Sequence, residues 1–549
     1  MSFFDDASLV MIPSGYKDQK VYSVKPTDGT GDLTFSRASS ATRVQSNGLI
    51  EKVRTNVLTY SQTFSDASWL IGTGQTKTQS QIDPNGGTTA VLISNVSEAN
   101  GYMSKALTLT ANVPNTFSIY IKGAASGSVS LRLDDSTAGP QFDINYTTSW
   151  QRFSVTRTVD QASCFLTVGG YSTWAIGENI QFAFAQVETG DIATAYIPTT
   201  TAAVSVGPVS GLPRLDYLGS TCPKLLLEPQ RTNLAIYSEQ FDNAGWGKTQ
   251  SGTGLVPVIT ANNAISPDGY QNADTIVFDV GAGTTSSDIS AMFQTFGGTT
   301  ATYTGSFYAK TASGTAQIQV RIDGSNYDKF TITNQWQRFT LTKALTGTSN
   351  VFEMAIRRGL NEPMNASATI QLWGVQVELG AYATSYIPTL GASVTRVADA
   401  ASKTSASALI GQTEGTIFWE FEFTTSVATG NEALLNIDNG SFGNTVYISK
   451  SASGGIVAEM YNGGVLQASL SLSSQPAGTY KAAIGYANNN TAFFVNGVQV
   501  GTTDTSCSVP AMSRIQLGNT AIGPSTDKTA QVLLFTTRLT NAQLAELTA

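Results

Sequence analysis

The chain has 549 residues, of which 41% are hydrophobic and 13% are charged, and its formal net charge is −8. The length suggests about three to five domains, and the acidic balance argues against nucleic-acid binding, which needs a basic stripe or patch. Histidine is absent, which excludes the Ser-His-Asp triad, the Cys-His dyad and histidine-ligated metals, so we expect no enzymatic activity.

Residues 1–53 are predicted to form a separate N-terminal segment for entry and attachment. They begin with acidic residues, and Pro13 breaks their apolar run, which is not the pattern of a secretory signal peptide. Asn47-Gly48 predicts a tight turn within this segment. No apolar run in the chain reaches the ~18 residues of a membrane-spanning helix, so we expect no membrane insertion.

The next part of the chain is duplicated. "RTNVLTYSQTFSDASW" from Arg54 returns as "RTNLAIYSEQFDNAGW" from Arg231, and "QVETGDIATAYIPTT" returns as "QVELGAYATSYIPTL". The period of roughly 180 residues is too long for a solenoid or propeller and has the size of a domain. We therefore predict a first domain at 54–204, a connector at 205–230 and a second domain, its duplicate, at 231–393.

Both copies have the pattern of β-strands. Phe117–Lys122, Val129–Asp134 and Ile318–Asp323 alternate apolar and polar residues, which indicates strands with one buried face. Clusters of Gly, Asn, Asp and Ser separate the strands. The two copies are predicted to be antiparallel β-sandwiches of the jelly-roll type.

Residues 394–549 are predicted to form a third domain, and the fold class of the whole chain is all-β. Successive strand patterns are joined by turns such as Asn496-Gly497. Thr540 with Gln543 three residues later predicts a capping box and a short closing helix.

Several stretches resemble known families. Gly478-Thr-Tyr480, Ala492–Gly497 and Leu539–Gln543 resemble the concanavalin A-like, laminin-G-like sandwich, and "WQRFSVTRT" with "QFAFAQVETG" resembles carbohydrate-binding-module-like jelly rolls. "FSRASSATRVQSNGLIEKVRTN", "LPRLDYLGSTCPKLLLEPQRTN" and "QVELGAYATSYIPT" resemble appendage proteins of tailed bacteriophages, such as tail or head fibres.

The resemblance implies a structural and adhesive virion component. It would be made in the host cytoplasm, form homo-oligomers, contact other virion proteins and bind host-surface glycans. Two alternatives stay open. One is a structural spacer without a ligand, and the other is a glycan-degrading enzyme, which would need a pair of carboxylates about 5–10 Å apart.

Five residues are candidates for ligand binding. Trp69 and Trp246 occupy equivalent positions and could stack on a sugar, although a core aromatic that anchors the first strand is the interpretation we favour. Asn488, Asn489 and Asn490 lie at a predicted hairpin tip, where lectin-like folds often bind ligands. Good turn chemistry is the interpretation that we favour for them. Tyr461 and Tyr486 could line the same surface.

Other matched residues are interpreted as structural. Arg54 and Arg231 are expected to form salt bridges with the entry segment, and Trp150 and Trp336 are expected in the core. The last strand of each copy carries a single glutamate; the expected pairs are Glu188 with Arg152 and Glu378 with Arg338.

No cofactor is expected, and the presence of a metal is left open. Asp134, Asp135 and Asp323 could contribute to a structural calcium site, which needs six to eight oxygen ligands. The three cysteines have neither zinc-type spacing nor a disulfide framework.

Overall fold

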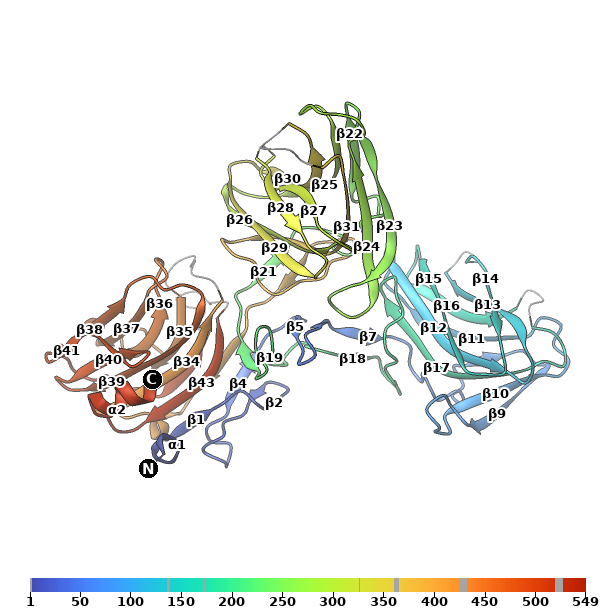
Figure 1. Cartoon of the computed structure of the whole chain (residues 1–549). Coiled ribbons are helices and arrows are strands. Elements are labelled where there is room, and N and C mark those ends of the chain that lie inside the picture. Colours follow the sequence, from blue (N-terminus) through green and yellow to red (C-terminus); the bar gives the residue numbers. More distant parts are fainter. Residues whose placement is uncertain are drawn as a thin grey trace. The chain divides into compact units, whose positions relative to one another are not determined.

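The computed structural model confirms an all-β fold built from antiparallel sandwiches (Figure 1). It describes residues 2–135, 139–170, 174–324, 326–359, 365–424, 432–518 and 527–549. The chain divides into two compact units: Val53–Gly207 with Tyr270–Asn272 form one, and Met1–Lys52, Pro208–Gly269 and Ala273–Ala549 form the other. In the described ranges no helix is long and apolar enough to cross a membrane.

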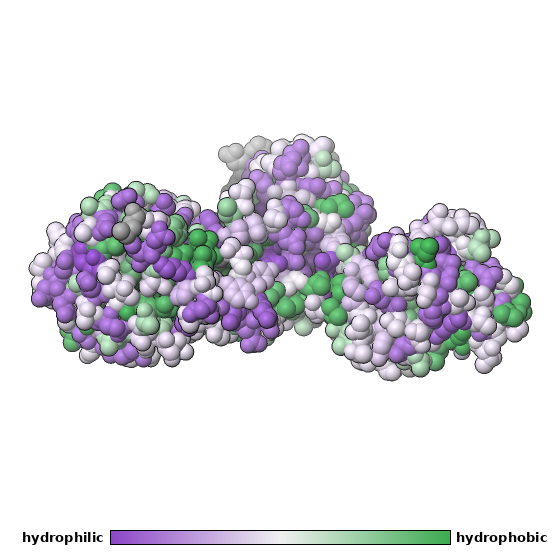
Figure 2. Space-filling view, turned by 90° about the horizontal axis from the view of Figure 1, so that it is seen from below, coloured by the Kyte–Doolittle hydropathy of each residue, from purple (hydrophilic) through white to green (hydrophobic). Residues whose placement is uncertain are grey.

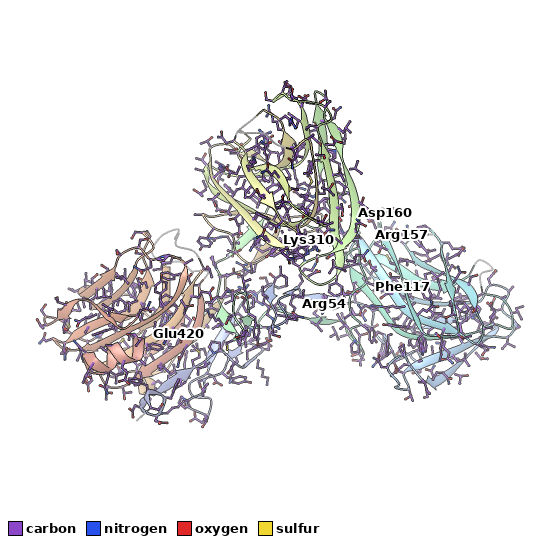
Figure 3. All side chains as sticks on the ribbon, in the orientation of Figure 1. Arg54, Phe117, Arg157, Asp160, Lys310 and Glu420 are labelled. Atoms are coloured by element: carbon purple, nitrogen blue, oxygen red, sulfur yellow. The ribbon has the colours of Figure 1, made fainter. Side chains whose placement is uncertain are left out.

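Copy 1, residues 54–204, is a sandwich of two five-stranded sheets. One sheet has the order β15 (Gln151–Thr158), β12 (Pro114–Gly123), β17 (Asn179–Thr189), β10 (Ala90–Asn95), β9 (Gln75–Gln81). The other has the order β14 (Phe142–Tyr146), β13 (Gly127–Asp134), β16 (Ser163–Gly169), β11 (Tyr102–Thr108), β8 (Leu70–Ile71). Alternate residues of both sheets, such as Phe117, fill the core between them (Figure 3).

Copy 2, residues 231–393, repeats this plan. Its sheets have the orders β23 (Leu255–Ile265), β24 (Gln271–Asp279), β31 (Ser367–Leu379), β26 (Ala301–Lys310), β29 (Gln337–Leu345) and β22 (Gly247–Ser251), β25 (Ile289–Gly297), β30 (Ser349–Arg357), β27 (Ala316–Arg321), β28 (Asp328–Ile332). A register shift lies between Ser118 and Tyr120 in copy 1 and between Ser306 and Tyr308 in copy 2. The duplication therefore preserved even a local irregularity of the strands.

The C-terminal sandwich has two larger sheets. One contains β19 (Arg214–Asp216), β20 (Lys224–Leu226), β43 (Lys528–Phe535), β34 (Glu414–Phe423), β39 (Gly478–Ala487), β40 (Thr491–Val495) and β41 (Val498–Asp504), with β1 (Leu9–Met11) paired to β43. The nine-stranded sheet has the order β2 (Tyr16–Lys17), β3 (Lys20–Val21), β4 (Leu33–Ser36), β33 (Ala400–Lys403), β42 (Arg514–Leu517), β35 (Glu432–Asp438), β36 (Thr445–Lys450), β37 (Ile456–Asn462), β38 (Val465–Leu472). Helix α2 (Asn541–Thr548) has the predicted capping box of Thr540 and Gln543.

Strands β1 to β4 of the N-terminal segment and strands β19 and β20 of the connector join the sheets of this sandwich, although the sequence predicts separate pieces at 1–53 and 205–230. Leu9 pairs with Leu534, Ala400 with Ser36, and Leu225 with Thr529. All three residues of β1 are buried. Such short apolar strands need neighbours in a sheet, and their neighbours lie hundreds of residues away in the sequence.

The unit that contains copy 2 and the C-terminal sandwich also has short paired strands and a buried ion network. β5 (Arg43–Val44) and β6 (Ile50–Glu51) form a hairpin, and β21 (Arg231–Asn233) pairs with β32 (Val394–Arg396). Arg214 bonds to Glu228 at 2.7 Å and also to Asp399, whose other oxygen accepts from Arg37 at 2.9 Å. Arg396 lies 2.8 Å from Glu228. These side chains are at most 3% exposed, so each buried charge needs its oppositely charged partner to offset the loss of hydration.

Candidate functional site

Trp69 and Trp246 are core residues, which corrects their assignment as ligand-binding candidates. Each is 1% exposed. Trp69 Nε1 donates to the Tyr60 carbonyl at 3.0 Å, and Trp246 Nε1 donates to the Tyr237 carbonyl at 3.0 Å. Neither ring offers a face to a sugar, and the favoured interpretation, an anchor for the first strand, describes both.

Asn488, Asn489 and Asn490 form the exposed tip between β39 and β40. Asn489 has φ of +57°, a conformation that Asn adopts more readily than most residues. The side-chain oxygen of Asn488 accepts from the Val509 amide at 2.9 Å. The structure thus gives this tip a role in turn formation, and ligand binding there stays a prediction.

The two matched glutamates bind their own exit loops, not the arginines expected as their partners. Glu188 accepts from the Thr194 amide at 2.9 Å, and Glu378 accepts from the Thr384 amide at 2.8 Å. Arg152 instead donates to the Thr194 carbonyl at 2.5 Å. In copy 2, Arg338 donates to the Thr384 carbonyl at 2.7 Å. The arginine and the glutamate therefore hold the same threonine from opposite sides.

The matched arginines and outer tryptophans also differ from expectation. Arg54 donates to the Tyr270 hydroxyl and lies 5.4 Å from the centre of that ring, whereas Arg231 lies 3.8 Å from Glu378. Arg231 thus lies beside a carboxylate of its own copy, and a salt bridge of Arg54 to the entry segment stays a prediction. Trp150 and Trp336 are half-buried outside the main cores.

The aspartates considered for calcium accept hydrogen bonds from nearby groups. Asp134 accepts from the Gly139 amide at 2.8 Å, Asp135 accepts from Arg157 at 3.1 Å, and Asp323 accepts from the Asn326 amide at 2.9 Å. Among the residues that the structure describes, no three His, Cys, Asp or Glu side chains converge on a common point.

The outer face of the nine-stranded sheet carries the arrangement best suited to a ligand. Strand register places Gln516, Asn436, Tyr447, Glu459 and Ser469 in one row across five strands. These positions alternate with residues such as Leu435, Ile437, Ile448 and Met460, which point into the core. The row therefore faces away from the core, as the two-residue period of a strand requires.

A second row runs beside the first. It contains Arg514, Asp438, Thr445, Tyr461 and Leu466. Arg514 binds Asp438 through two hydrogen bonds of 2.6 and 2.9 Å, and Asp438 is 1% exposed. The bidentate pair is buried at its acidic end, while 29% of the arginine side chain stays exposed.

Three aromatic rings gather over β36 and β37, and we call Phe442, Tyr447, Tyr461 and Glu459 the aromatic platform. Phe442, from the loop before β36, has its ring centre 5.5 Å from that of Tyr447 and 5.3 Å from that of Tyr461. The two tyrosine rings are nearly parallel, at 10° and 6.4 Å. Phe442 is 43% exposed, so part of its ring meets solvent.

Glu459 links the two tyrosines. It accepts from the Tyr447 hydroxyl, from the Tyr461 hydroxyl at 3.4 Å and from the Ser469 hydroxyl at 3.0 Å. Burial, together with the neighbouring carboxylate, raises the pKa of Tyr447 well above its usual value. Tyr447 is therefore a neutral donor at physiological pH, and the carboxylate is fixed in orientation on the sheet.

Only part of this site could be predicted from the sequence. The sequence suggests Tyr461 and Tyr486, but Tyr486 is buried, and its hydroxyl donates to the Gly411 carbonyl at 3.0 Å. Phe442, Tyr447 and Glu459 were missed. Their signal was the alternation in "NTVYISK" and "GGIVAEMYNG", whose outward positions include Tyr447, Glu459 and Tyr461.

Parts of the chain are similar to a few solved structures. No family profile and no curated protein matches the chain. The CBM40 of Ruminococcus gnavus IT-sialidase is similar at 18% identity, covering 26% of this chain and 84% of that one, with a TM-score of 0.22. The CBM22-1–CBM22-2 tandem domain of Paenibacillus barcinonensis Xyn10C has 12% identity, covering 60% of this chain and 98% of that one, with a TM-score of 0.23.

A SAP-like pentraxin from Limulus polyphemus is also similar, at 10% identity over 24% of this chain and 69% of that one, with a TM-score of 0.19. At such identities and scores the likeness does not extend to any binding residue. The aromatic platform therefore rests on its own geometry.

Proposed function

We propose that the chain is a non-catalytic glycan-binding protein whose aromatic platform holds the sugar. The observation that carries this proposal is the exposed ring of Phe442 beside Tyr461, with the oriented carboxylate of Glu459 on the same face. Binding sites generally combine apolar and aromatic surface with a few well-placed polar groups. This platform has both.

The chemistry of the platform suits a carbohydrate. An aromatic ring packs against the apolar C–H face of a pyranose, while the hydroxyl groups of the sugar donate to fixed acceptors. Glu459 is such an acceptor, and Arg514, with 29% of its side chain exposed, adds a donor on the same sheet face. A neutral hydroxyl-rich sugar fits this combination, because an anionic group beside Glu459 would meet like charge.

Cleavage is less well supported than binding. Glycoside hydrolysis needs two carboxylates that work on one bond. The other carboxylate in the two rows described above, Asp438, accepts from two of the three guanidinium nitrogens of Arg514 and is 1% exposed. It is therefore poorly placed to donate a proton or to attack a sugar, and we propose that the protein is not an enzyme.

The wider role proposed here is that of a virion component. The resemblance of "FSRASSATRVQSNGLIEKVRTN" and "QVELGAYATSYIPT" to appendage proteins of tailed bacteriophages supports a structural and adhesive protein of a tail or head fibre. It would be homo-oligomeric, located in the virion, in contact with other virion proteins and directed at host glycans. Antibody labelling of intact particles tests this placement, and absence of the protein from purified particles contradicts it.

A glycan array with matched variants tests the binding site. Phe442→Ala is expected to reduce the signal at least tenfold, because the exposed stacking surface is lost. Phe165→Ala is the matched control, since Phe165 is 45% exposed on copy 1 and lies away from any such platform. If the unaltered protein binds no glycan, or if both variants lose binding equally, the proposal fails and the alternative of a structural spacer is favoured.

A further inference from the structure

A lysine and two carboxylates meet where the N-terminal segment contacts copy 2. Lys52 directly follows β6, Glu239 lies in the loop between β21 and β22, and Asp268 lies in the turn between β23 and β24. The Nζ atom of Lys52 lies 2.7 Å from an oxygen of Asp268 and 2.7 Å from an oxygen of Glu239. All three residues belong to one compact unit. Segments far apart in the sequence therefore bring an amine and two carboxyl groups into direct contact.

The hairpin β5–β6 fixes the position of this lysine. The Ile50 amide donates to the Pro267 carbonyl at 2.9 Å, and Pro267 directly precedes the aspartate. The Thr42 hydroxyl donates to the Tyr386 carbonyl at 2.6 Å. Ile50 also packs with Tyr386 in an apolar cluster. The place of the lysine beside the aspartate therefore does not depend on its ion pairs alone.

The surroundings of the three groups are largely aromatic. The Nζ atom of Lys52 lies 5.3 Å from the centre of the Trp373 ring, which is fully buried, and Tyr386 is 1% exposed. The side chains of Lys52 and Glu239 are each 16% exposed, and that of Asp268 is 2% exposed. Little water therefore reaches the site to hydrate the charges or to compete with the amine for a carboxyl group.

Each carboxyl group has a second partner that fixes its orientation. The Ser266 hydroxyl donates at 2.6 Å to the oxygen of Asp268 that does not face the lysine. The Tyr386 hydroxyl donates to Glu239 at 2.8 Å. The hydrogen bond from Ser266 polarises the carboxyl group of Asp268 and stabilises negative charge that develops on its oxygen. The carboxyl carbon of Asp268 is thus presented to the amine.

Two carboxylates beside one ammonium group leave an excess negative charge. Burial lowers the pKa of Lys52, but Glu239 and Asp268 outweigh it and raise that pKa. Burial raises the pKa of Glu239, and the charge of Asp268 acts in the same direction. The lysine is therefore an ammonium group, and the two carboxyl groups favour one further proton between them. Glu239 is a stronger base than an ordinary carboxylate when it is ionised.

Copy 1 has none of the three groups at the equivalent positions. "IDPNGG" of copy 1 corresponds to "ISPDGY" of copy 2, so Asn85 stands where copy 2 has the aspartate. Gln62 stands where copy 2 has the glutamate, and Pro229, ahead of copy 2, corresponds to Lys52, ahead of copy 1. The lysine and its two carboxylates are therefore specific to one joint of the chain and do not belong to the duplicated framework.

We propose that Lys52 and Asp268 form an intramolecular isopeptide bond, with Glu239 as the group that transfers protons. The ammonium group of Lys52 gives one proton to the Glu239 carboxylate, and the resulting amine attacks the carboxyl carbon of protonated Asp268. A C–N bond forms, and the C–O bond to the carboxyl hydroxyl breaks. The second proton of the nitrogen leaves with this hydroxyl as water, and Glu239 ends the step protonated. No oxidant, reductant or other co-reactant is consumed.

Proximity drives this condensation. An amine and a carboxylic acid condense poorly in dilute solution, but reactants that a protein holds in contact have effective concentrations of about 10⁵–10⁸ M. The product joins the N-terminal segment to copy 2 covalently. Lys52 ends its part of the unit, and Val53 begins the unit of copy 1. The bond therefore closes a ring that contains all of copy 1, and a cross-link over so long a loop restricts the unfolded chain.

Intact-mass spectrometry of the denatured full-length protein tests the proposal. The expected mass is below that of the sequence by the mass of one water molecule. A tryptic digest is expected to contain a branched peptide that joins the two segments, because trypsin does not cleave after an amidated lysine. Lys52→Arg and Glu239→Gln are both expected to have their full sequence mass, since the first lacks the amine and the second lacks the base. Circular dichroism verifies that each variant is folded.

The matched control is Lys224→Arg, which is expected to keep the mass deficit. The side chain of Lys224 is 14% exposed and lies 2.6 Å from Glu422. A full sequence mass of the unaltered protein overturns the proposal, as does loss of the deficit in Lys224→Arg. A deficit that persists in Lys52→Arg also overturns it and indicates a succinimide at Asp268-Gly269, which loses water without the lysine. An unchanged deficit in folded Glu239→Gln refutes the role of the glutamate.

Discussion

Replacing Asp399 by Asn tests the buried ion network. Asp399 accepts from Arg37 at 2.9 Å, from the Glu228 amide at 2.8 Å and from Arg214, and its side chain is fully buried. The amide keeps the shape but removes the charge, and its NH₂ group must face one of these donors. Arg37 would keep its bonds to carbonyl groups such as that of Val209 and lose its carboxylate.

Removing one partner from a buried charge network costs about 3–5 kcal/mol. This is a large part of the ~5–15 kcal/mol that stabilises a folded protein. Urea unfolding followed by hydrogen-exchange mass spectrometry separates the two units of the chain. We expect the loss in the unit that contains Asp399, and no change in Val53–Gly207.

The control is Lys343→Gln, which removes a partly exposed ion pair with Asp328 at 2.8 Å and is expected to cost less than about 1 kcal/mol. A cost below ~1 kcal/mol for Asp399→Asn would refute the reasoning, because the network would then contribute no more than a surface pair. An equal loss in both units would also refute it, because the effect would not be local.

Three further predictions concern acid, the N-terminal strand and the aromatic exchange. Burial opposes ionisation of Glu228, but the guanidinium groups of Arg396 and Arg214 outweigh it and lower the pKa of Glu228 below the usual 4.5. A carboxyl group with a lowered pKa stabilises the folded state at every pH above its unfolded-state pKa. We therefore expect stability to fall as the pH drops below about 4.5, less steeply in Glu228→Gln, and equal slopes in urea titrations would contradict this. Deleting residues 2–12 removes a fully buried strand, so calorimetry should show a destabilised C-terminal sandwich, and an unchanged transition would contradict its place beside β43. Copy 1 has Ala183 and Phe184 where copy 2 has Trp373 and Gly374. In copy 1, Phe184→Gly alone should cost about 3–5 kcal/mol in urea unfolding, and adding Ala183→Trp should recover most of it; no recovery would contradict the equivalence of the two ring positions.

Figure 2 shows one face of the molecule, coloured by hydropathy. Seen from below, apolar residues form small separate patches among polar ones (Figure 2). Scattered apolar residues are normal on soluble proteins and do not by themselves mark a site. The candidate sites discussed above therefore depend on specific groupings of aromatic and polar side chains.

The sequence alone determined the local structure and the duplication. The two-residue alternation in Phe117–Lys122 and Ile318–Asp323 fixes which side chains face a core, because successive residues of a strand point to opposite sides. The repeated Tyr-Ile-Pro-Thr exit marks the end of each copy, and the capping box of Thr540 is readable from two residues. These features depend only on neighbours along the chain.

Tertiary structure decided which strands meet and which aromatic residues stay exposed. β1 joins β43, whose residues lie more than 500 positions away, and no local pattern specifies that pairing. The sequence suggested Trp69 for stacking on a sugar and gave no reason to choose Phe442, but Trp69 is buried in a sandwich and Phe442 is 43% exposed in a loop. Exposure depends on what packs against a side chain, and in this protein those partners come from distant parts of the chain.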